Sequence, residues 1–275
     1  MVPVSVIIVT KNEESRLADC LAAFSGFDAP LIVVDSASHD KTCAIARAYR
    51  ARIVPFTWDG HYPKKRQWCL DHLALAHEWV WFVDADEIVS PALLAEIKAL
   101  FSSGAPPCNG YFIESRYRLD GILLRYGLRN KKLCLFDRRE LHFPHLDDLA
   151  LDGMGEIEGH YQPVRRPGHG NAVIGVLKNN MEHRVDDVAA WRERHRSYAL
   201  WESGMNAGRL WPRDPVFWRD VAKTIFRAVP LRGEIMFLYG YILRSGFLDG
   251  AAGLRWALMR RDYYRMIAAA SKSPA

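Results

Sequence analysis

The chain has 275 residues, of which 49% are hydrophobic and 25% are charged, and its formal net charge is +5. This composition excludes a chain without a packed core and is typical of a soluble globular protein. The five cysteines are scattered and include no C-x-x-C pair, which argues against a disulfide framework or a zinc site and favours a reducing cytoplasm. The N-terminus lacks the features of a signal peptide. The longest apolar stretch near the C-terminus, between Glu234 and Arg244, is about half of the ~20 residues that a membrane-spanning helix needs.

Buried strands and amphipathic helices alternate in the first hundred residues. Residues 4–10 (VSVIIVT) are a continuous β-branched run, which is typical of a strand buried on both faces. Ser90 and Pro91 are the expected N-cap and first residue of the helix that ends this region. Strands that alternate with helices predict a mostly parallel sheet with right-handed crossovers. The expected strands are residues 4–10, 30–36, 51–56 and 79–86, and the expected helices are residues 13–24, 40–50, 63–77 and 90–101.

The pattern changes after the loop at residues 102–110. The next strand-like segments are close together, so they predict hairpins rather than crossovers. One more strand is expected at residues 175–183, and the sequence becomes helical from Asp186 onward. The expected hairpin strands are residues 111–119, 122–127 and 131–137, and the expected helices are residues 186–208, 214–229, 233–246 and 253–270.

The charge is distributed unevenly between the body and the C-terminal part. Residues 1–183 contain 21 Lys and Arg against 23 Asp and Glu, which gives −2, whereas residues 184–275 contain 16 against 9, which gives +7. The second segment also contains five of the nine tryptophans. A basic, tryptophan-rich end on a nearly neutral body predicts a partner with an anionic surface.

The strand ends carry acids instead of a glycine-rich turn. In open α/β sheets, ligands bind outside the carboxyl ends of the strands. The first strand ends in Thr10-Lys11-Asn12-Glu13, without G-x-G-x-x-G, which argues against NAD or FAD, and no P-loop motif occurs. The second strand ends in Asp35, and the fourth ends in Asp84-Ala85-Asp86-Glu87. These acids predict a site for a cation and for sugar or base hydroxyls at one edge of the sheet.

Asp84 and Asp86 form a D-x-D pair at the end of the fourth strand. In an extended chain both side chains point the same way, whereas in a turn one can accept from a ribose hydroxyl while the other holds Mg²⁺ or Mn²⁺. Such a metal would neutralise a departing diphosphate. The alternative is a solvated turn whose acids favour the start of the following helix. Taken with Asp35 at another strand end, the pair favours the metal hypothesis.

At this point the sequence resembles the family 2 glycosyltransferases. The resemblance is carried by SVIIVTKNEESRLADCL, IVVDSASHDKTCAIA and WVWFVDADEIVSP. Within that family, the segments YPKKRQWCL and GFLDGAAGLRWALMRRDYYR look most like bacterial lipopolysaccharide-core and related cell-surface glycosyltransferases. The resemblance implies the α/β GT-A fold, with a Rossmann-like, mostly parallel sheet and an acceptor subdomain, here followed by a C-terminal amphipathic helical extension. It also implies a nucleotide-diphosphate sugar donor and, usually, inversion of the anomeric centre.

The resemblance assigns a donor role to residues at the first two strand ends. It implies that Thr10, Asn12 and Glu13 lie beside the nucleotide, and that Asp35 reads the base through uracil N3–H. For Glu13 the alternative is an acid in the first turn of a helix, which is favourable there in any case. For Asp35 the alternative is a loop residue that caps the following turn.

The resemblance assigns further roles around the fourth strand. It implies that Lys65 and Arg66 approach the base or the phosphates, that Asp84 contacts the ribose and that Asp86 coordinates the metal. His183 fits a family position where a histidine faces the diphosphate, as a metal ligand or a phosphate contact. The alternative for Lys65 and Arg66 is a solvated basic helix face, and a single histidine at a strand end often has neither of these functions.

An inverting transfer needs a carboxylate that removes the proton of the acceptor hydroxyl. This residue is expected after the nucleotide half of the sheet. Glu156 is our choice, because DGMGEIEGH best matches a family segment with an isolated glutamate in a glycine-flanked loop. Each candidate is otherwise a solvated loop acid. The candidates are Asp147, Asp148, Asp152, Glu156 and Glu158.

The C-terminal helices combine apolar stripes with arginines. In residues 214–229, one face carries Phe217, Val221, Ile225 and Val229, and Arg219, Lys223 and Arg227 lie away from it. One interpretation is a helix packed on the body with a solvated basic face. The other is a helix that lies on a membrane without spanning it, recruited in part by about 1 kcal/mol per basic residue near an anionic leaflet. Nucleic acid is a weaker alternative, because no recognition motif is present.

These observations predict a metal-dependent glycosyltransferase with a UDP-sugar donor, Mg²⁺ or Mn²⁺ as cofactor and a lipid-linked or lipopolysaccharide-core glycan acceptor. The expected location is the cytoplasm, at the inner face of the cytoplasmic membrane. Alternatives are a peptide or protein acceptor, a nucleotidyltransferase and a catalytically inactive sugar-nucleotide-binding regulator. The expected organisation is a nucleotide-sugar-binding half at residues 1–105, an acceptor-binding half of the same domain at residues 106–183, and a membrane-associating helical extension at residues 184–275.

Overall fold

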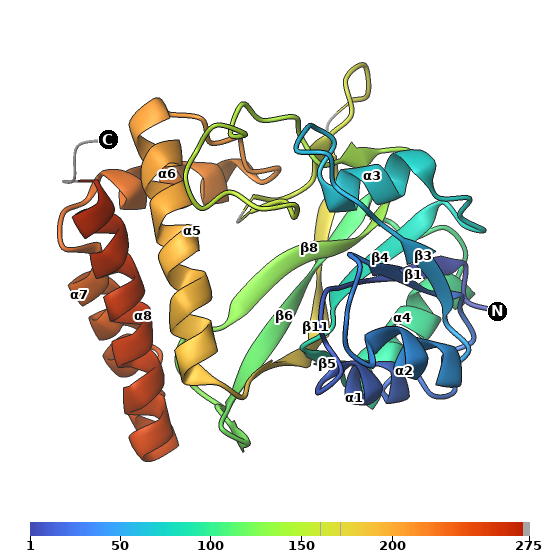
Figure 1. Ribbon diagram of the computed structural model, residues 1–275, viewed down its shortest axis with the longest axis horizontal. Coiled ribbons are helices and arrows are strands. Elements are labelled where there is room, and N and C mark those ends of the chain that lie inside the picture. The colour runs from blue at the N-terminus through green and yellow to red at the C-terminus, as the bar shows by residue number, and fades with distance from the viewer. Residues whose placement is uncertain (160, 171, 272–275) are drawn as a thin grey trace.

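The computed structural model describes residues 1–159, 161–170 and 172–271, and its main feature is a nine-stranded mixed sheet (Figure 1). The strands of this sheet are β1 (Val4–Thr10), β2 (Leu31–Asp35), β3 (Arg52–Pro55), β4 (Trp79–Asp84), β5 (Glu87–Val89), β6 (Gly110–Leu119), β7 (Ile122–Leu123), β8 (Asn130–Asp137) and β11 (Ile174–Val185). Their order is β3-β2-β1-β4-β8-β6-β11-β5, with β7 paired to β6. β9 (Leu141–His142) and β10 (Val164–Arg165) form a separate antiparallel pair.

The first four strands are parallel, as the alternation of strands and helices predicts. Helices α1 (Leu17–Ala22) and α2 (Thr42–Ala48) lie on one face of these strands, and α3 (Lys65–His72) lies on the other (Figure 1). α3 is shorter than the expected helix. α4 (Pro91–Ser102) begins as predicted, because Ser90 Oγ accepts a hydrogen bond of 3.2 Å from the backbone N–H of Leu93. The α/β class is therefore confirmed.

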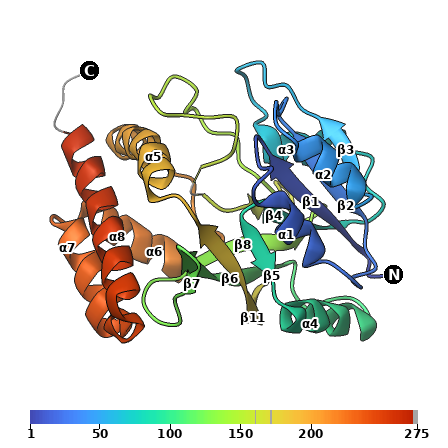
Figure 2. The same ribbon diagram turned by 60° about the horizontal axis from the view of Figure 1, so that its bottom comes forward.

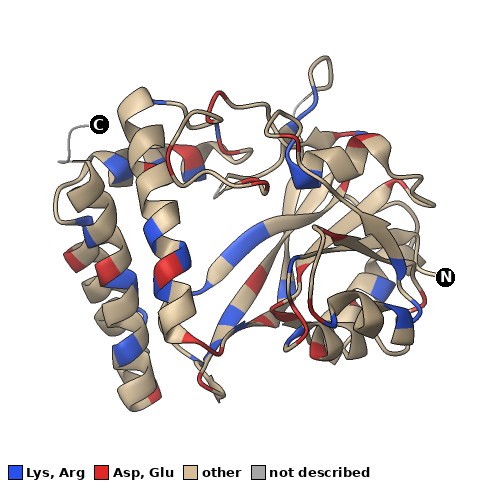
Figure 3. Cartoon of the chain, viewed as in Figure 1, with Lys and Arg blue, Asp and Glu red and all other residues tan. Residues whose placement is uncertain are grey.

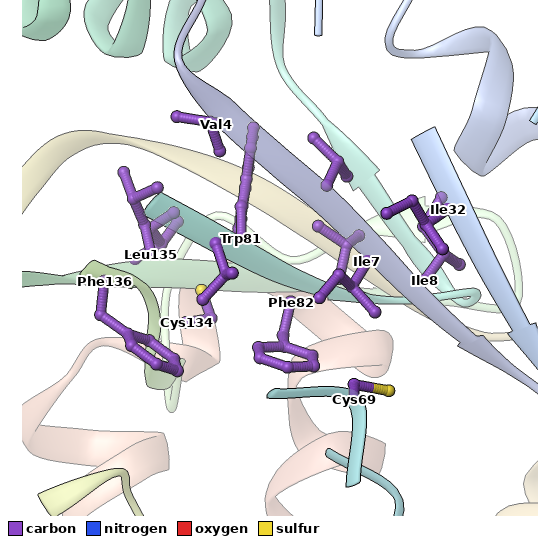
Figure 4. Close-up of a cluster of buried hydrophobic side chains, with 14 of the residues drawn as sticks. Val4, Ile7, Ile8, Ile32, Cys69, Trp81, Phe82, Cys134, Leu135 and Phe136 are labelled. Carbon is purple, nitrogen blue, oxygen red and sulfur yellow. The ribbon is translucent and has the colours of Figure 1, made fainter. Parts of the chain in front are cut away.

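The core of this half is built on both faces of β4. Trp81 and Phe82 point to opposite sides of the strand, as successive strand residues must (Figure 4). Trp81 is fully buried and packs edge-on against Phe24, with ring centroids 5.4 Å apart. Phe82 packs edge-on against Phe143 on the other side, at 5.6 Å. Because each buried aromatic contributes about 1.5–3 kcal/mol, this core fixes β4 and the acids at its end.

The second half of the sheet is more mixed. β8 is antiparallel to both β4 and β6, β11 is parallel to β6, and β5 is antiparallel to β11. The expected hairpin strand at residues 122–127 is reduced to the two residues of β7. The three-residue strand β5 was not predicted. It follows the D-x-D pair directly, and its pairing with β11 sets His183 opposite Glu87.

The C-terminal helices lie on the side of the molecule away from β1, β2 and β3 in two views (Figures 1 and 2). α5 and α8 pack on the end of β6 through a second hydrophobic cluster that includes Leu119, Trp191 and Trp256. The predicted division of the chain near residues 105 and 183 stays a prediction. The helical elements are α5 (Val188–Gly208), α6 (Phe217–Ala228), α7 (Arg232–Phe237), a π-helix (Leu238–Leu243), a 3₁₀-helix (Gly246–Asp249) and α8 (Gly250–Ala270).

Helix α6 is oriented with its apolar side outward. Phe217 and Ile225 are 67% and 60% exposed, and the helix contains no buried residue. The basic side faces the body: the Arg219 guanidinium lies 4.3 Å from the centroid of the Phe112 ring. For α6, therefore, packing of the apolar stripe on the body with a solvated basic face is wrong. Within the described residues, no helix is long and apolar enough to cross a membrane.

Candidate active site

The carboxyl ends of β1, β2 and β4 bring three polar side chains to one edge of the sheet. In the strand register, Thr10 is paired with Asp35, and Val9 is paired with Asp84. The Thr10 hydroxyl donates a hydrogen bond of 2.8 Å to Oδ1 of Asp35. The sheet therefore places the acids of two separate strand ends close together, as the sequence predicts.

Asp35 is a buried carboxylate surrounded by donors. Ser38 donates to it from both its hydroxyl group, at 2.6 Å, and its backbone N–H, at 2.9 Å. Burial alone would raise the pKa of Asp35, but the hydrogen bonds from Ser38 and Thr10 outweigh burial and lower it. Asn12 holds the same loop, because its backbone N–H donates to Ser38 Oγ and its side chain accepts from the N–H of His39. Asp35 thus stays ionised and fixed in position, as a selective acceptor requires.

Asp84 is held by two cations from different parts of the chain. Its Oδ1 is 2.8 Å from the Arg66 guanidinium, and its Oδ2 is 2.7 Å from Lys132 Nζ. Burial alone would raise the pKa of Asp84, but Lys132 and Arg66 keep it well below the ordinary range. Arg66 comes from the start of α3, and Lys132 comes from β8. The ion pairs therefore tie the end of β4 to both halves of the sheet.

Glu87 is fully buried beneath the D-x-D turn. Its Oε1 is 2.6 Å from Lys132 Nζ and accepts from the Ser115 hydroxyl at 3.3 Å, and its Oε2 accepts from the backbone N–H of Asp84 at 3.0 Å. Burial would raise its pKa, but Lys132 outweighs this effect and lowers it. Glu87 therefore supports the turn from inside the protein.

Asp86 faces His183 across the pairing of β5 with β11. Oδ1 of Asp86 lies 3.6 Å from Nδ1 of His183, and both atoms are buried without a hydrogen-bond partner in the described part of the chain. Arg16 is 3.8 Å from the other oxygen of Asp86. Burial alone would lower the pKa of His183, but Asp86 and Glu87 outweigh burial and raise it. Two potential ligand atoms thus lie 3.6 Å apart.

This pair fits a divalent cation in part. Among residues 1–159, 161–170 and 172–271, no group of three or more His, Cys, Asp or Glu side chains is arranged to hold a metal ion. Asp86 and His183 nevertheless have orphaned polar atoms, and a carboxylate oxygen with an imidazole nitrogen suits Mn²⁺ and related ions. Mg²⁺ and Mn²⁺ commonly keep waters or substrate phosphates in their remaining positions. The residues present are therefore compatible with a metal ion whose remaining coordination positions are filled by a bound substrate or by water.

Glu13 lies on the other side of Arg16 from this pair. Its Oε2 is 2.8 Å from the Arg16 guanidinium, and its backbone N–H donates to the Thr42 hydroxyl. Burial raises the pKa of Glu13 to about 7, with Arg16 opposing the increase and Asp86 adding to it. Glu13 is therefore electrostatically coupled to the D-x-D acids, in addition to its place at the start of the first helical turn.

Lys65 and Glu156 meet at the end of β2. Lys65 is fully buried, and its Nζ donates to the backbone oxygen of Thr10 at 2.8 Å and to Ser36 Oγ at 2.7 Å. Oε1 of Glu156 accepts from the Ser36 hydroxyl and lies 3.7 Å from Lys65 Nζ. Burial lowers the pKa of Lys65, and Glu156 opposes this change. The structure thus brings Glu156 to the Asp35 side of the edge, not to the Asp86–His183 pair.

The other candidates for the general base have different surroundings. Glu158 is buried, and its carboxylate accepts from the backbone N–H groups of Arg66 and Gln67, at the first turn of α3. Asp148 is buried in an ion pair of 2.7 Å with Lys64. Both carboxylates thus stabilise the fold through these contacts. The remaining candidates, Asp147 and Asp152, are exposed.

The sequence interpretation missed several residues of this region. The sequence pattern places Lys132 in a strand and predicts no site role for Lys132, Arg16 or Ser36. Lys132 neutralises two acids, yet nothing local in KKLCLFD indicates a partner in β4. One usable signal was available for Arg16, because it follows Glu13 at the i, i+3 spacing of a helical ion pair.

Comparison with known proteins identifies the class of the first half. Residues 5–127 match the family model described as glycosyl transferase family 2. The chain is therefore similar to that family over this segment, in agreement with the family resemblance seen in the sequence.

The curated relatives are similar to this chain over a limited length. An uncharacterized glycosyltransferase, RT0209, of Rickettsia typhi is 34% identical over 103 residues, which are 38% of this chain and 34% of that protein. The lipopolysaccharide core biosynthesis glycosyltransferase LpsC of Rhizobium meliloti is 31% identical over 96 residues, which are 33% of this chain and 34% of that protein. The chain thus spans about a third of the length of the curated relatives that it matches.

Solved structures resemble the fold more weakly. S. aureus TarS 1-349 superposes with a TM-score of 0.46 and 16% identity, covering 97% of this chain and 90% of that one. Glucosyl-3-phosphoglycerate synthase from Mycobacterium tuberculosis, in complex with Mn²⁺, UDP-glucose and glycerol 3-phosphate, has a TM-score of 0.32 and 26% identity, covering 42% of this chain and 44% of that one.

Proposed function

We propose that this chain is a metal-dependent, inverting glycosyltransferase that transfers a sugar from a UDP-sugar to a lipid-linked or lipopolysaccharide-core glycan. One observation carries the proposal: within the segment that matches the family, Asp35 and Asp84 converge on one edge of the sheet, and Asp86 follows them at the turn. Ligands of open α/β sheets bind at this edge.

The donor nucleotide is proposed to lie across the ends of β1, β2 and β4. Asp35 would accept from uracil N3–H, beside Thr10 and Asn12, because its ionised carboxylate is already positioned by Ser38. Asp84 would accept from a ribose hydroxyl. A carboxylate offers about four lone-pair sites, so Asp84 can do this while it keeps its two cations. Lys65, Arg66 and Glu13 complete the proposed donor side.

Asp86 and His183 are the proposed metal ligands. A divalent cation held by them would supply positive charge against the departing diphosphate. The side chains around the pair support a fixed geometry: the His183 ring packs edge-on against Tyr117, with centroids 5.3 Å apart, and Arg16 flanks Asp86. Glu87 lies behind both, bound to Lys132. These contacts position the two ligand atoms but make no hydrogen bond to either of them.

Glu156 remains the proposed general base. Its two contacts, with Ser36 and Lys65, both use Oε1, so Oε2 is left to take the proton of an acceptor hydroxyl. This role requires the acceptor to reach the loop beside the end of β2. The ammonium group of Lys65, 3.7 Å from Oε1, also favours a competing role for Glu156 on the donor side.

The acceptor and the location are inferred from sequence similarity and from exposed surface. The match to a lipopolysaccharide core glycosyltransferase supports a glycolipid acceptor. Exposed apolar side chains in residues 217–248 support contact with the inner face of the cytoplasmic membrane, without nucleic acid as a partner. The most exposed of these are Phe217, Trp218, Ile225, Leu231 and Leu243. A peptide acceptor and an inactive sugar-nucleotide-binding regulator are the competing functions.

A donor screen by thermal unfolding tests the proposal. A UDP-sugar at 100 times its Kd, with Mn²⁺ or Mg²⁺ present, should add about 2.7 kcal/mol of apparent stability. Slow, metal-dependent hydrolysis of the same UDP-sugar without acceptor would then separate an enzyme from an inactive regulator. Stabilisation by a nucleoside triphosphate instead of any UDP-sugar would point to a nucleotidyltransferase and contradict the proposal.

A further inference from the structure

A pocket of about 150 Å³ lies among the C-terminal helices, outside the sheet-edge site. Its walls come from α5, the segment after α5, α6 and α8. Three of its lining residues are cations, namely Lys223, Arg227 and Arg260, and one is an acid, Glu202. The proposed donor site uses none of these residues, so the pocket is available for another ligand.

The charge of the pocket is not balanced by the protein. The lining residues carry a formal charge of +2. Glu202 is already engaged, because it accepts from the Tyr263 hydroxyl at 2.8 Å and from Arg232 at 3.5 Å. Lys223 has its own partner in Asp214, at 2.7 Å, so including Arg232 and Asp214 leaves the sum at +2. Burial lowers the pKa of Arg227, with Glu202 only partly opposing this effect.

Aromatic rings hold the arginines in place. The Arg227 guanidinium stacks 3.9 Å from the centroid of the Trp211 ring. The Arg260 guanidinium lies 5.5 Å from the Tyr263 ring and 5.8 Å from the Tyr264 ring. A guanidinium that lies over an aromatic ring still directs its N–H groups outward in its own plane, where they can bind an oxyanion in a fixed geometry.

The pocket is linked to the proposed metal position through two aromatic residues. The Tyr117 ring lies 5.3 Å from the His183 ring and 4.1 Å from the Trp256 ring, and the Arg260 guanidinium lies 5.8 Å from Trp256. Burial raises the pKa of Tyr117, and the Arg260 guanidinium opposes this increase. Two aromatic side chains, Tyr117 and Trp256, therefore connect Arg260 of the pocket with His183 of the Asp86–His183 pair.

We propose that this pocket binds a phosphate group carried by a sugar of the acceptor. The inference rests on the proposed function for its link to transfer. A phosphomonoester carries close to −2 at neutral pH, which matches the charge of +2. Guanidinium groups bind phosphate through paired, charge-assisted hydrogen bonds. The proposal therefore names an acidic, phosphorylated glycan as the acceptor class.

Isothermal titration of glucose 6-phosphate into the full chain, with Mn²⁺ and excess UDP present, tests the pocket. Binding should fall about 10-fold or more in both Arg227→Gln and Arg260→Gln, because each loses charge-assisted hydrogen bonds. Arg255→Gln is the matched control, since Arg255 also lies on α8 but is exposed and pairs with Asp120 outside the pocket. Unphosphorylated glucose should give no measurable binding. Having two pocket variants keeps the test decisive if one of them fails to fold.

Equal affinity for glucose 6-phosphate in the wild type and in both pocket variants would overturn the inference, as would absence of binding to the wild type. Titration of UDP with Mn²⁺ into the same variants reports separately on the proposed function, and its affinity should be unchanged in all of them. Loss of UDP binding in both pocket variants would contradict a separate acceptor pocket. If the wild type binds glucose 6-phosphate but not UDP, the donor proposal fails and the anion pocket stands.

Discussion

The parallel half of the sheet and the C-terminal helices differ in where their polar and apolar side chains point. In β1 and β4 the strand interiors are buried, and the acids at the strand ends are held by Arg66, Lys132 or neighbouring hydroxyl groups. In α6 the order is reversed, since Phe217 and Trp218 are exposed while Arg219 lies over Phe112. Lys and Arg recur along the C-terminal helices in Figure 3.

This difference indicates that the two regions have different functions. The sheet edge pairs most of its charges internally, and within the described residues the facing atoms of Asp86 and His183 are among its buried polar atoms without a hydrogen-bond partner. The helical part leaves an uncompensated pocket and exposed apolar side chains, which are features of a surface made for partners. The chemistry should therefore depend on the first region and the docking on the second. The following variants test that separation.

The largest effect is expected for Asp86→Asn. It removes a charged ligand atom from the proposed metal position, so turnover should fall more than about 100-fold, since even outer-shell partners of metal ligands cost about 10–100-fold. The fold should survive, because Asp86 lies in a turn after β4. Steady-state transfer with Mn²⁺ or Mg²⁺, compared with the same assay in chelator, provides the measurement. Asp59→Asn, at an exposed loop position, is the matched control.

Normal activity of Asp86→Asn in metal-replete buffer would remove Asp86 from the site. If Asp86→Asn were largely unfolded at the assay temperature, so that the loss of folded protein accounted for the loss of activity, the residue would be structural.

Glu156→Gln should lower kcat by about 10²–10⁴-fold, which is the usual contribution of a general base. The amide keeps the shape and can still accept from Ser36, but it cannot take a proton. UDP affinity should be nearly unchanged, and titration of UDP alongside the kinetics measures this. If UDP affinity falls with kcat, the contact with Lys65 is the important one and Glu156 acts on the donor side.

Glu158→Gln provides a different comparison. Glu158 accepts from two backbone N–H groups at the first turn of α3, so its loss should appear first as lower thermal stability. If Glu158→Gln lost activity while keeping full stability, the base would lie two residues further along the loop than we propose.

Asp35→Ala should weaken UDP binding about 10- to 100-fold, as expected for one hydrogen bond to a charged group, with little change in metal dependence. Ser38→Ala is the control, because it removes the 2.6 Å hydrogen bond that positions Asp35 but keeps the carboxylate. Isothermal titration of UDP into both variants distinguishes direct recognition of the base by Asp35 from an effect on the loop that contains Asp35 and Ser38. Equal losses in the two variants would show that Asp35 only forms the turn.

The smallest effect is expected on the helical side, from the double change Phe217→Ser and Trp218→Ser. Because both side chains are exposed, stability should hardly change, while partitioning onto anionic vesicles should fall about 10-fold. Binding to vesicles should also rise with anionic lipid and fall in 1 M salt, where the screening length is about 3 Å. Vesicle flotation measures both, with the exposed Tyr49→Ser as control. Binding that ignores lipid charge and salt would exclude electrostatic recruitment.

The parallel strands and their acidic ends could be predicted because they depend on local information. A β-branched run predicts a buried strand, and parallel strands bring their carboxyl ends to one edge, so Asp35 and Asp84 follow from the pattern. The partner of Asp84 could not be predicted in this way. Lys132 reaches it only because β8 inserts beside β4 in antiparallel register, and that pairing joins residues about fifty positions apart.

Two other features depend on the same kind of long-range contact. His183 lies opposite Glu87 because a three-residue strand, β5, pairs with β11, and such a short segment has no pattern of its own. The stripe in α6 shows which residues share a face but not which face turns outward. The orientation of α6 depends on Phe112 and Trp211, which lie outside the helix and whose rings contact the guanidinium groups of Arg219 and Arg227.

The central claim is that the sheet edge binds a nucleotide diphosphate together with a metal held at Asp86. Isothermal titration of UDP, with and without Mn²⁺, into the wild type and Asp86→Asn tests it most directly. We predict that Mn²⁺ tightens UDP binding to the wild type at least about 10-fold, that it does not tighten binding to the variant, and that metal-free affinities are similar. Equal enhancement by Mn²⁺ in both proteins, or no UDP binding to the wild type under any condition, would contradict the account.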